Sequence, residues 1–157
     1  MTEQMSVKIA ALPSLRLTVE AHGLMAKKAL GQNFLLDQNI TDKIINLSLQ
    51  KQNKKDFSGA NVFEVGPGPG GLTRAVLAAE PKSLTVVEMD ERCIAIMNEI
   101  KEKTGDILHI INGDAMQTDF SVLAPAPRHI VSNLPYNISV PLLVGWLKNI
   151  NAYDSLT

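Results

Sequence analysis

The sequence holds a single cysteine, Cys93, among its 157 residues. One thiol excludes an internal disulfide and a cysteine-based metal site, and it fits the reducing conditions of the cytoplasm. Long apolar runs are also missing, because no stretch reaches the roughly 18 apolar residues of a membrane-spanning helix. No apolar segment follows a basic start, as it would in a signal peptide. We therefore expect a cytoplasmic protein without membrane or metal partners.

Neither sign of charge dominates, since 15 Lys and Arg stand against 16 Asp and Glu and give a formal net charge of −1. This balance indicates no particular partner, nucleic acid included. Basic residues do gather at positions 27–28 and 51–55, but a solvated surface explains them more simply than a phosphate-binding stripe. Charge leaves the partner open. The length predicts one domain with its own core.

From residue 60 onward, short runs rich in Val and Ile alternate with helical patterns. The predicted strands are residues 61–65, 84–88, 107–111 and 129–133, and the predicted helices are residues 71–80, 91–103 and 140–148. This alternation predicts an open, Rossmann-like α/β fold, with a parallel sheet and helices on both faces. Ligands of such sheets bind at the carboxyl ends of the strands. Four strands are few for this architecture, so we expect an incomplete sheet.

The N-terminal part has a different pattern. It predicts a short helix over residues 13–22, ended by Gly23, and then a loop that runs to residue 36. Asp37 is positioned to cap a helix that carries Ile40, Ile44 and Leu47 at helical spacing. We divide the chain into residues 1–36, an N-terminal helix with a cofactor-closing loop, and residues 37–157, the Rossmann-like core.

A glycine-rich turn follows the first predicted strand. Gly66, Gly68 and Gly71 satisfy the dinucleotide fingerprint G-x-G-x-x-G, because glycine lets the backbone turn tightly and approach a ligand closely. Glu88 stands 20 residues after Gly68, where a ribose-binding acid belongs. An NAD-dependent oxidoreductase is therefore one interpretation of this turn.

Three features favour a nucleotide methyltransferase instead. Glu64 precedes Gly66 by two residues, and the E-x-G-x-G form suits a cationic sulfonium ligand better than a pyrophosphate. Pro67 and Pro69 remove amide donors that a pyrophosphate cradle would use. Asp114 ends the third predicted strand, where an acid can accept a hydrogen bond from an adenine amine. Taken singly, each acid could simply form a turn or a cap.

The fourth predicted strand ends in Asn133, Leu134, Pro135 and Tyr136. N-L-P-Y is a form of the (D/N/S)-P-P-(Y/F/W) motif of methyltransferases that modify exocyclic amines; a plain proline turn before a helix capped by Ser139 is the alternative. The exocyclic nitrogen of adenine is a poor nucleophile because its lone pair is delocalised into the ring. Acceptors on Asn133 and Leu134 would draw the pair back onto nitrogen, and Tyr136 offers a face for stacking a flipped base.

Together these segments resemble one family, the bacterial small-subunit rRNA adenine dimethyltransferases, which are related to the macrolide-resistance rRNA methyltransferases. The residues that carry the resemblance are 27–35 (K-K-A-L-G-Q-N-F-L), 64–73 (E-V-G-P-G-P-G-G-L-T), 87–90 (V-E-M-D), 113–115 (G-D-A) and 133–139 (N-L-P-Y-N-I-S). The G-Q-N-F-L loop is the most specific of them, because dehydrogenases and generic methyltransferases, DNA adenine methyltransferases included, lack it.

The resemblance implies S-adenosyl-L-methionine as the cofactor and assigns a part of the site to each motif. Asn33 and Leu35 would close over the methionine end of the cofactor, and Gly66 would line its backbone pocket. Glu88 would bind the ribose hydroxyls, and Asp114 the adenine amine. Gly68, Met89 and Ala115 would line the same site, with Asn133 beside the transferring methyl group.

The implied activity is the transfer of two methyl groups to each of two adjacent adenosines in the terminal hairpin of 16S rRNA, within the immature small ribosomal subunit. A 23S rRNA methyltransferase of the macrolide-resistance type, an NAD-dependent oxidoreductase and a non-catalytic ribosome-assembly factor are the alternatives. Family members continue through further strands and a helical domain. We therefore expect a bare edge on the fourth strand, with weak cofactor affinity and little methylation by residues 1–157 alone.

Overall fold

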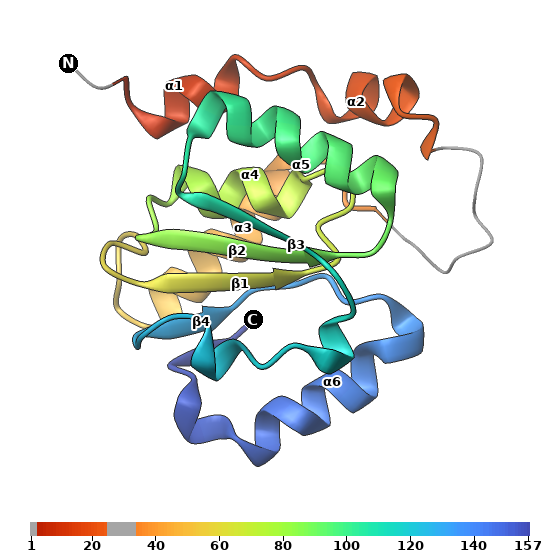
Figure 1. Cartoon of the computed structure of the whole chain (residues 1–157). Helices are drawn as coiled ribbons and strands as arrows, with labels where there is room; N and C mark the ends of the chain where they lie inside the picture. Colours follow the sequence, from red (N-terminus) through yellow and green to blue (C-terminus); the bar gives the residue numbers. More distant parts are fainter. Residues whose placement is uncertain (1–2, 25–33) are drawn as a thin grey trace.

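The structure is a computed structural model that describes residues 3–24 and 34–157. Its centre is a five-stranded sheet in the order β3-β2-β1-β4-β5, and all neighbouring strands are parallel (Figure 1). The strands are β1 (Asn61–Val65), β2 (Ser83–Glu88), β3 (Leu108–Asn112), β4 (Arg128–Ile130) and β5 (Ser155–Leu156). The α-helices are α1 (Met5–Ala10), α2 (Leu15–Ala21), α3 (Gln38–Lys51), α4 (Gly71–Ala78), α5 (Glu91–Thr104) and α6 (Tyr136–Lys148). Short 3-10 helices are η3 (Ala115–Gln117), η4 (Phe120–Val122) and η5 (Ile150–Ala152).

Side chains along the central strand alternate between two hydrophobic cores. Val62 of β1 belongs to one core, and Phe63 and Val65 belong to the other, as expected from the two-residue period of a strand. Every residue of β1 is buried, since β2 and β4 flank it on either side. Continuous burial explains why these strands appear in the sequence as unbroken apolar runs.

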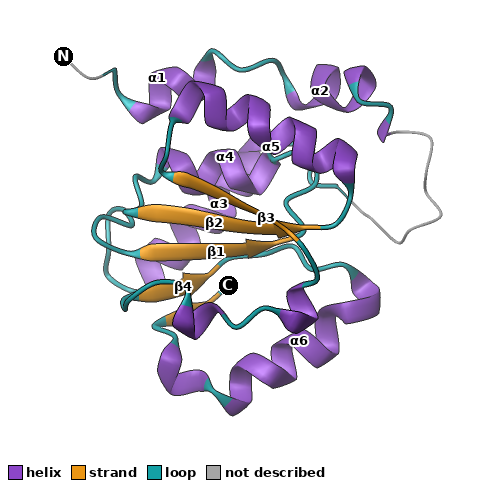
Figure 2. Cartoon of the chain, in the orientation of Figure 1, coloured by secondary structure: helices purple, strands orange, loops and turns teal. Residues whose placement is uncertain are grey.

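The two cores are covered by different elements. The larger core packs residues of α2, α3, α4 and α5 against the sheet. The smaller core lies under α6 and η4, with Phe63 stacked on Phe120 at a centroid distance of 4.8 Å. Figure 2 shows α6 on the side of the sheet opposite α4 and α5. Helices therefore cover both faces, and the α/β class predicted from the sequence is confirmed.

Most predicted elements are present with small shifts at their ends. Asp37 caps α3, as predicted, by accepting a hydrogen bond from the Asn39 backbone N–H at 2.9 Å. The helix predicted over residues 140–148 begins instead at Tyr136, directly after Pro135, and continues through Pro141. The fourth strand ends at Ile130, earlier than predicted. Helix α1 was not predicted.

The expectation of a bare edge on β4 is wrong. Residues 155–156 form β5, which pairs with β4 through His129–Ser155 and Ile130–Leu156. Backbone bonds extend this pairing, because Thr157 N–H donates to the Ile130 carbonyl at 2.8 Å and Ser132 N–H donates to the Thr157 carbonyl at 3.0 Å. Two residues are too few to give a strand pattern in the sequence, so β5 depends on tertiary pairing.

Across residues 3–24 and 34–157, no helix has the length and apolar character needed to cross a membrane. The same residues contain no group of three or more His, Cys, Asp or Glu side chains arranged to hold a metal ion.

Candidate active site

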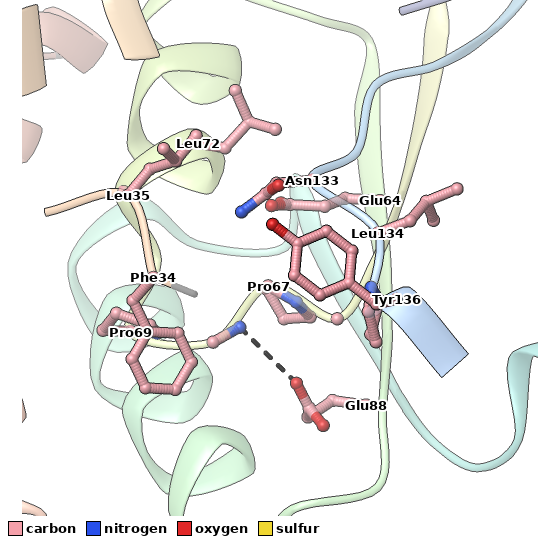
Figure 3. Close-up of a pocket in the computed structure, with 14 residues that line it drawn as sticks. Phe34, Leu35, Glu64, Pro67, Pro69, Leu72, Glu88, Asn133, Leu134 and Tyr136 are labelled. Atoms are coloured by element: carbon pink, nitrogen blue, oxygen red, sulfur yellow. Dashed lines mark hydrogen bonds between the residues drawn. The ribbon is translucent and has the colours of Figure 1, made fainter. Parts of the chain in front are cut away.

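The carboxyl ends of four parallel strands meet at one edge of the sheet, where they border two adjoining clefts. The inner cleft is lined by Phe34, Leu35, Glu64, Gly66, Pro67, Gly68, Pro69, Gly71, Leu72, Glu88, Asn133, Leu134, Pro135 and Tyr136 (Figure 3). The outer cleft is lined by Val65, Gly66, Val87, Glu88, Met89, Gly113, Asp114, Ala115, Met116, Pro135, Asn137 and Ile138. The two share Gly66, Glu88 and Pro135, so a ligand with two parts can extend from one to the other.

The turn after β1 is closely packed against its neighbours. Gly66 and Gly68 have φ values of 65° and 55°, in the left-handed region that glycine adopts readily. A Cβ atom at Gly68 would lie 2.8 Å from the Phe34 ring, and one at Gly66 would lie 3.3 Å from Pro135 Cγ. The missing side chains therefore keep the floor of the inner cleft open between Phe34 and Pro135.

Glu88, the last residue of β2, is held by backbone donors. Its Oε1 accepts hydrogen bonds from the N–H groups of Met89 at 2.8 Å and Asp90 at 3.0 Å. Its Oε2 accepts a longer bond from the Gly68 N–H at 3.5 Å, drawn as a dashed line in Figure 3. Because a carboxylate has about four lone-pair positions, further donors from a ligand can still bind Glu88.

Glu64 projects from β1 and is 2% exposed. Its Oε2 accepts a hydrogen bond from the Thr73 hydroxyl at 2.7 Å. Burial raises the pKa of Glu64 to about 8, the Thr73 bond lowers it, and the nearby Glu88 raises it further. The inner cleft thus holds a buried carboxyl group whose ionisation is opposed by its surroundings.

Ser132 fixes the segment that follows β4. Its hydroxyl donates to the Val65 carbonyl at 2.6 Å and accepts from the Val65 N–H at 3.1 Å. This pair of bonds joins the residue before Asn133 to the residue before Gly66. The N-L-P-Y segment and the glycine turn therefore keep a fixed spacing across the cleft.

The four residues of the N-L-P-Y segment all line the inner cleft. Pro135 is the N-cap residue of α6, and Tyr136 is the first residue of that helix. The Tyr136 side chain is 70% exposed, so its ring can contact a ligand that arrives from solvent. Figure 3 shows Asn133, Glu64 and Tyr136 around the same cavity.

The outer cleft has an acidic residue at its far end. Asp114 follows β3 and caps η3 by accepting a bond from the Met116 N–H at 2.8 Å. Met89, at the end of β2, is 67% exposed. An apolar side chain this exposed beside a cleft offers a surface for a flat ligand group.

The segment that contains the sheet and all of these motifs matches a known protein family. The family model described as "Ribosomal RNA adenine dimethylase" matches residues 23–156, which is most of the chain. The chain belongs to this family.

A curated relative of the dimethylase family from Allorhizobium ampelinum is 51% identical over 150 residues and is named "Ribosomal RNA small subunit methyltransferase A". That alignment covers 93% of this chain and 52% of the relative. The chain spans about half the length of the curated relatives it matches.

Two solved structures share the fold. A dimethyladenosine transferase from Plasmodium falciparum superposes with a TM-score of 0.59 and 30% identity, over 74% of this chain and 38% of that one. A methyltransferase from Podospora anserina, solved with bound SAH, gives a TM-score of 0.58 at 16% identity, over 94% of this chain and 65% of that one. The sheet is thus the Rossmann-like sheet of class I methyltransferases.

Within the dimethylase fold, nearly all the residues singled out from the sequence gather at these clefts. The inner cleft contains Leu35, Gly66, Gly68, Glu88, Asn133, Leu134, Pro135 and Tyr136. The outer cleft contains Met89, Asp114 and Ala115. Asn33 lies outside the described residues.

Sequence reasoning missed some residues that shape the site. Phe34 closes the inner cleft over Gly68, and its place in the G-Q-N-F-L loop was the only signal for it. Ser132 positions the N-L-P-Y segment, but a serine at a strand end has no distinctive pattern. Ile138 lines the outer cleft because α6 starts earlier than predicted.

The charge of the clefts indicates the kind of ligand that fits them. Their described lining residues include three acids, Glu64, Glu88 and Asp114, and no Lys, Arg or His. A pyrophosphate would be repelled by this set, whereas a cationic ligand would be attracted. The open glycine floor and the two anchored acids, Glu88 and Asp114, fit a nucleoside that carries a positively charged amino-acid tail.

Proposed function

We propose that this chain binds S-adenosyl-L-methionine and positions the N6 amine of adenine in 16S rRNA for methylation. The proposed product carries two methyl groups on each of two adjacent adenosines of the 3′ terminal hairpin, within the immature small subunit in the cytoplasm. The observation that carries the proposal is a shared cleft: the N-L-P-Y segment, Glu88 and the glycine turn all line it. The names of the relatives, which refer to small-subunit rRNA, support the choice of RNA.

The cofactor would extend across both clefts. S-adenosyl-L-methionine, when bound, supplies a methyl group that its sulfonium activates. Glu88 would accept hydrogen bonds from the ribose hydroxyls and Asp114 from the adenine amine, with Met89 and Ala115 completing the outer cleft. Gly66, Gly68 and Leu35 would line the methionine end, together with Asn33. The acidic lining supports this ligand over NAD.

The target adenine would enter beside Tyr136 and stack on its exposed ring, a contact worth roughly 1–3 kcal/mol. The Asn133 side-chain oxygen and the Leu134 carbonyl would accept hydrogen bonds from the two protons of the exocyclic amine. These bonds return lone-pair density to the nitrogen, and Pro135 stiffens the backbone that presents them. The Ser132–Val65 bonds keep these acceptors aligned with the glycine turn.

Cofactor binding is tested by isothermal titration with S-adenosyl-L-methionine, with NAD as the comparison ligand. We expect S-adenosyl-L-methionine to bind and Glu88→Ala to lower its affinity about 100-fold, because the variant removes a buried acceptor for ribose hydroxyls. Glu91→Ala, an exposed glutamate on the first turn of α5, is the matched control and should bind like wild type. Binding of NAD alone would refute the proposed cofactor.

Methyl transfer is tested with isotopically labelled cofactor and immature small subunits, with 23S rRNA as the comparison substrate. Asn133→Ala should lower the transfer rate about 100–1000-fold, the effect of losing a preorganised acceptor, and change cofactor affinity far less. Asn39→Ala, an exposed asparagine in the first turn of α3, should leave the rate unchanged. Equal rates for Asn133→Ala and wild type would exclude the catalytic role.

A further inference from the structure

Glu64 is a buried acid that forms no ion pair with any residue in the described parts of the chain. Its side chain is among the large side chains that are almost completely buried, at 2% exposure. The ion pairs among the described residues are Arg16–Glu20, His22–Glu99, Arg92–Asp90 and Lys101–Asp106, and none includes Glu64. The Thr73 hydroxyl donates a hydrogen bond to its Oε2 at 2.7 Å.

The described elements that pack around Glu64 place no positive charge beside it. On β2, Glu88 lines the same cleft and adds a second negative group. On α5, Met97 contributes a thioether behind the Thr73 hydroxyl, and Asn133, after β4, contributes a neutral amide to the cleft. Arg74, next to Thr73 on α4, directs its guanidinium elsewhere, to the Pro13 carbonyl and the Thr18 hydroxyl.

An ionised carboxylate in such a place is costly, because it loses hydration and the described residues supply no cation in return. The protonated form avoids this cost and still accepts the Thr73 bond. The same carboxyl group faces a cleft whose shape and acidity suit a positively charged ligand. A cation in the cleft would supply what Glu64 lacks.

We propose that Glu64 holds a proton in the free protein and releases it when the positively charged methionine end of the cofactor binds. The inference rests on the proposed function. The O–H bond of the Glu64 carboxyl breaks, the proton passes to solvent, and the resulting carboxylate pairs with the positive charge of the ligand. No other bond changes. Glu64 thereby makes the affinity of the site depend on ligand charge and on pH.

The raised pKa of Glu64, about 8, agrees with this arrangement, since burial is its largest cause. Below that pH, binding must displace the proton. The apparent dissociation constant for S-adenosyl-L-methionine should therefore fall about tenfold between pH 6 and pH 7, and level off above pH 8. The Glu64→Gln variant has no proton to release, so its affinity should not follow this dependence.

The test has a first step that needs no ligand. Carbon-13 NMR of protein labelled at the glutamate side chains follows each carboxyl group through a pH titration. We expect one carboxyl to titrate well above the others, and its signal to be missing in Glu64→Gln and present in Glu91→Gln. A Glu64 carboxyl that ionises with the ordinary glutamates would overturn the inference.

In the second step, the ligand is added at pH 7, and titration calorimetry in phosphate and in Tris buffer counts the protons released. Close to one proton per S-adenosyl-L-methionine, with Glu64 moving to its ionised shift, supports the inference. S-adenosylhomocysteine lacks the sulfonium charge but keeps the ammonium. Equal release with both ligands assigns the effect to the ammonium, and larger release with S-adenosyl-L-methionine assigns it to the sulfonium.

Two outcomes separate this inference from the proposed function. If resonances elsewhere in the cleft shift on titration while Glu64 stays protonated, the cofactor binds and the coupling is refuted. If no resonance shifts and no heat is detected with S-adenosyl-L-methionine, the proposed function is refuted, and with it the release step. The ligand-free NMR titration tests whether Glu64 is protonated in the free protein, and its outcome does not depend on either of these results.

Discussion

The α4–α5 face of the sheet and the α6 face are covered to different degrees. Over the first face, residues of α2 to α5 pack into one continuous core, and α4 is buried over nearly its whole length. Over the second face, α6 buries only Leu142 and Trp146. Its outer side carries an exposed apolar stripe at helical spacing, formed by Val140, Leu143, Val144 and Leu147 and continued by Ile150.

This difference shows how the parts of the site are supported. Glu64, Glu88 and the glycine turn lie at the ends of β1 and β2, on the well-covered face of the sheet. Tyr136 begins the helix that covers the other face. The part of the site assigned to the cofactor is therefore held by a packed core, whereas the part assigned to the target base lies at the start of a half-exposed helix.

The largest difference between the faces should appear in leucine truncations. Leu77 on α4 is completely buried in the larger core, and Leu147 on α6 is 53% exposed. We expect Leu77→Ala to lower the free energy of unfolding by about 3–5 kcal/mol, because it loses buried surface and leaves a cavity. The matched change Leu147→Ala should alter it by less than about 0.5 kcal/mol. Urea unfolding measures both.

Similar losses in the two leucine variants would break the comparison and show that α6 packs more tightly than its exposure indicates.

The thiol of Cys93 gives a second measurement, since it is buried in the larger core and burial raises its pKa to about 12. Its labelling by a thiol reagent should accelerate in Leu77→Ala and stay at the wild-type rate in Leu147→Ala.

A smaller effect should come from the acid that β1 directs toward the well-covered face. The native pKa of Glu64, about 8, lies above its ordinary value of 4.5, so the folded protein retains a proton that the unfolded chain has lost. Its contribution to stability is therefore fully present below pH 4.5 and is lost as the pH rises to about 8. Between pH 5 and pH 9 this change is at most roughly 4 kcal/mol.

Glu64→Gln should remove this dependence, because an amide does not titrate. We expect the unfolding free energies of wild type and variant to diverge between pH 5 and pH 9, with the variant gaining relative stability at the alkaline end. Denaturant unfolding at both pH values, without ligand, makes the measurement. A constant difference between the two proteins would show that Glu64 titrates alike in the folded and unfolded chains.

The sequence predicted the cofactor side of the molecule better than the far edge, and the reason is physical. Glycines, prolines and acidic residues at fixed spacing determine the local backbone structure. The turn after β1 and the acids Glu88 and Asp114 could therefore be placed from the sequence. Strand β5 could not, because its two residues are too few to give a strand pattern and are held by pairing with β4. The early start of α6 depends on Pro135 as its N-cap residue, with Pro141 tolerated two turns later.

The contacts that position the residues of the site could not be predicted from the sequence either. The Ser132 hydroxyl joins residues 67 positions apart, and nothing in the residues around Ser132 or Val65 predicts that contact. The raised pKa of Glu64 is a similar case. The E-x-G-x-G spacing indicated an acid near the cofactor, but it did not indicate that this acid is buried, and the burial is what raises its pKa.

The smallest effect concerns a link on the well-covered face between α2 and the turn after β2. The Arg92 guanidinium donates to Asp90 at 3.0 and 2.6 Å and to the Gly23 carbonyl at 3.1 Å, and it holds the pKa of Asp90 below its ordinary value. Asp90 in turn donates its backbone N–H to Glu88. Arg92 therefore steadies the turn that presents the Glu88 carboxylate.

Arg92→Met keeps the length of the side chain and removes all three hydrogen bonds, so we expect the dissociation constant for S-adenosyl-L-methionine to rise roughly threefold. Arg16→Met is the matched control: the Arg16 side chain is 88% exposed and its ion pair among the described residues is with Glu20, one turn along α2, so its loss should not affect binding. Calorimetric titration of the three proteins decides the matter. An unchanged affinity in Arg92→Met would mean that packing of the larger core alone fixes the turn after β2. The two faces of the sheet would then differ in packing even more than these hydrogen bonds indicate.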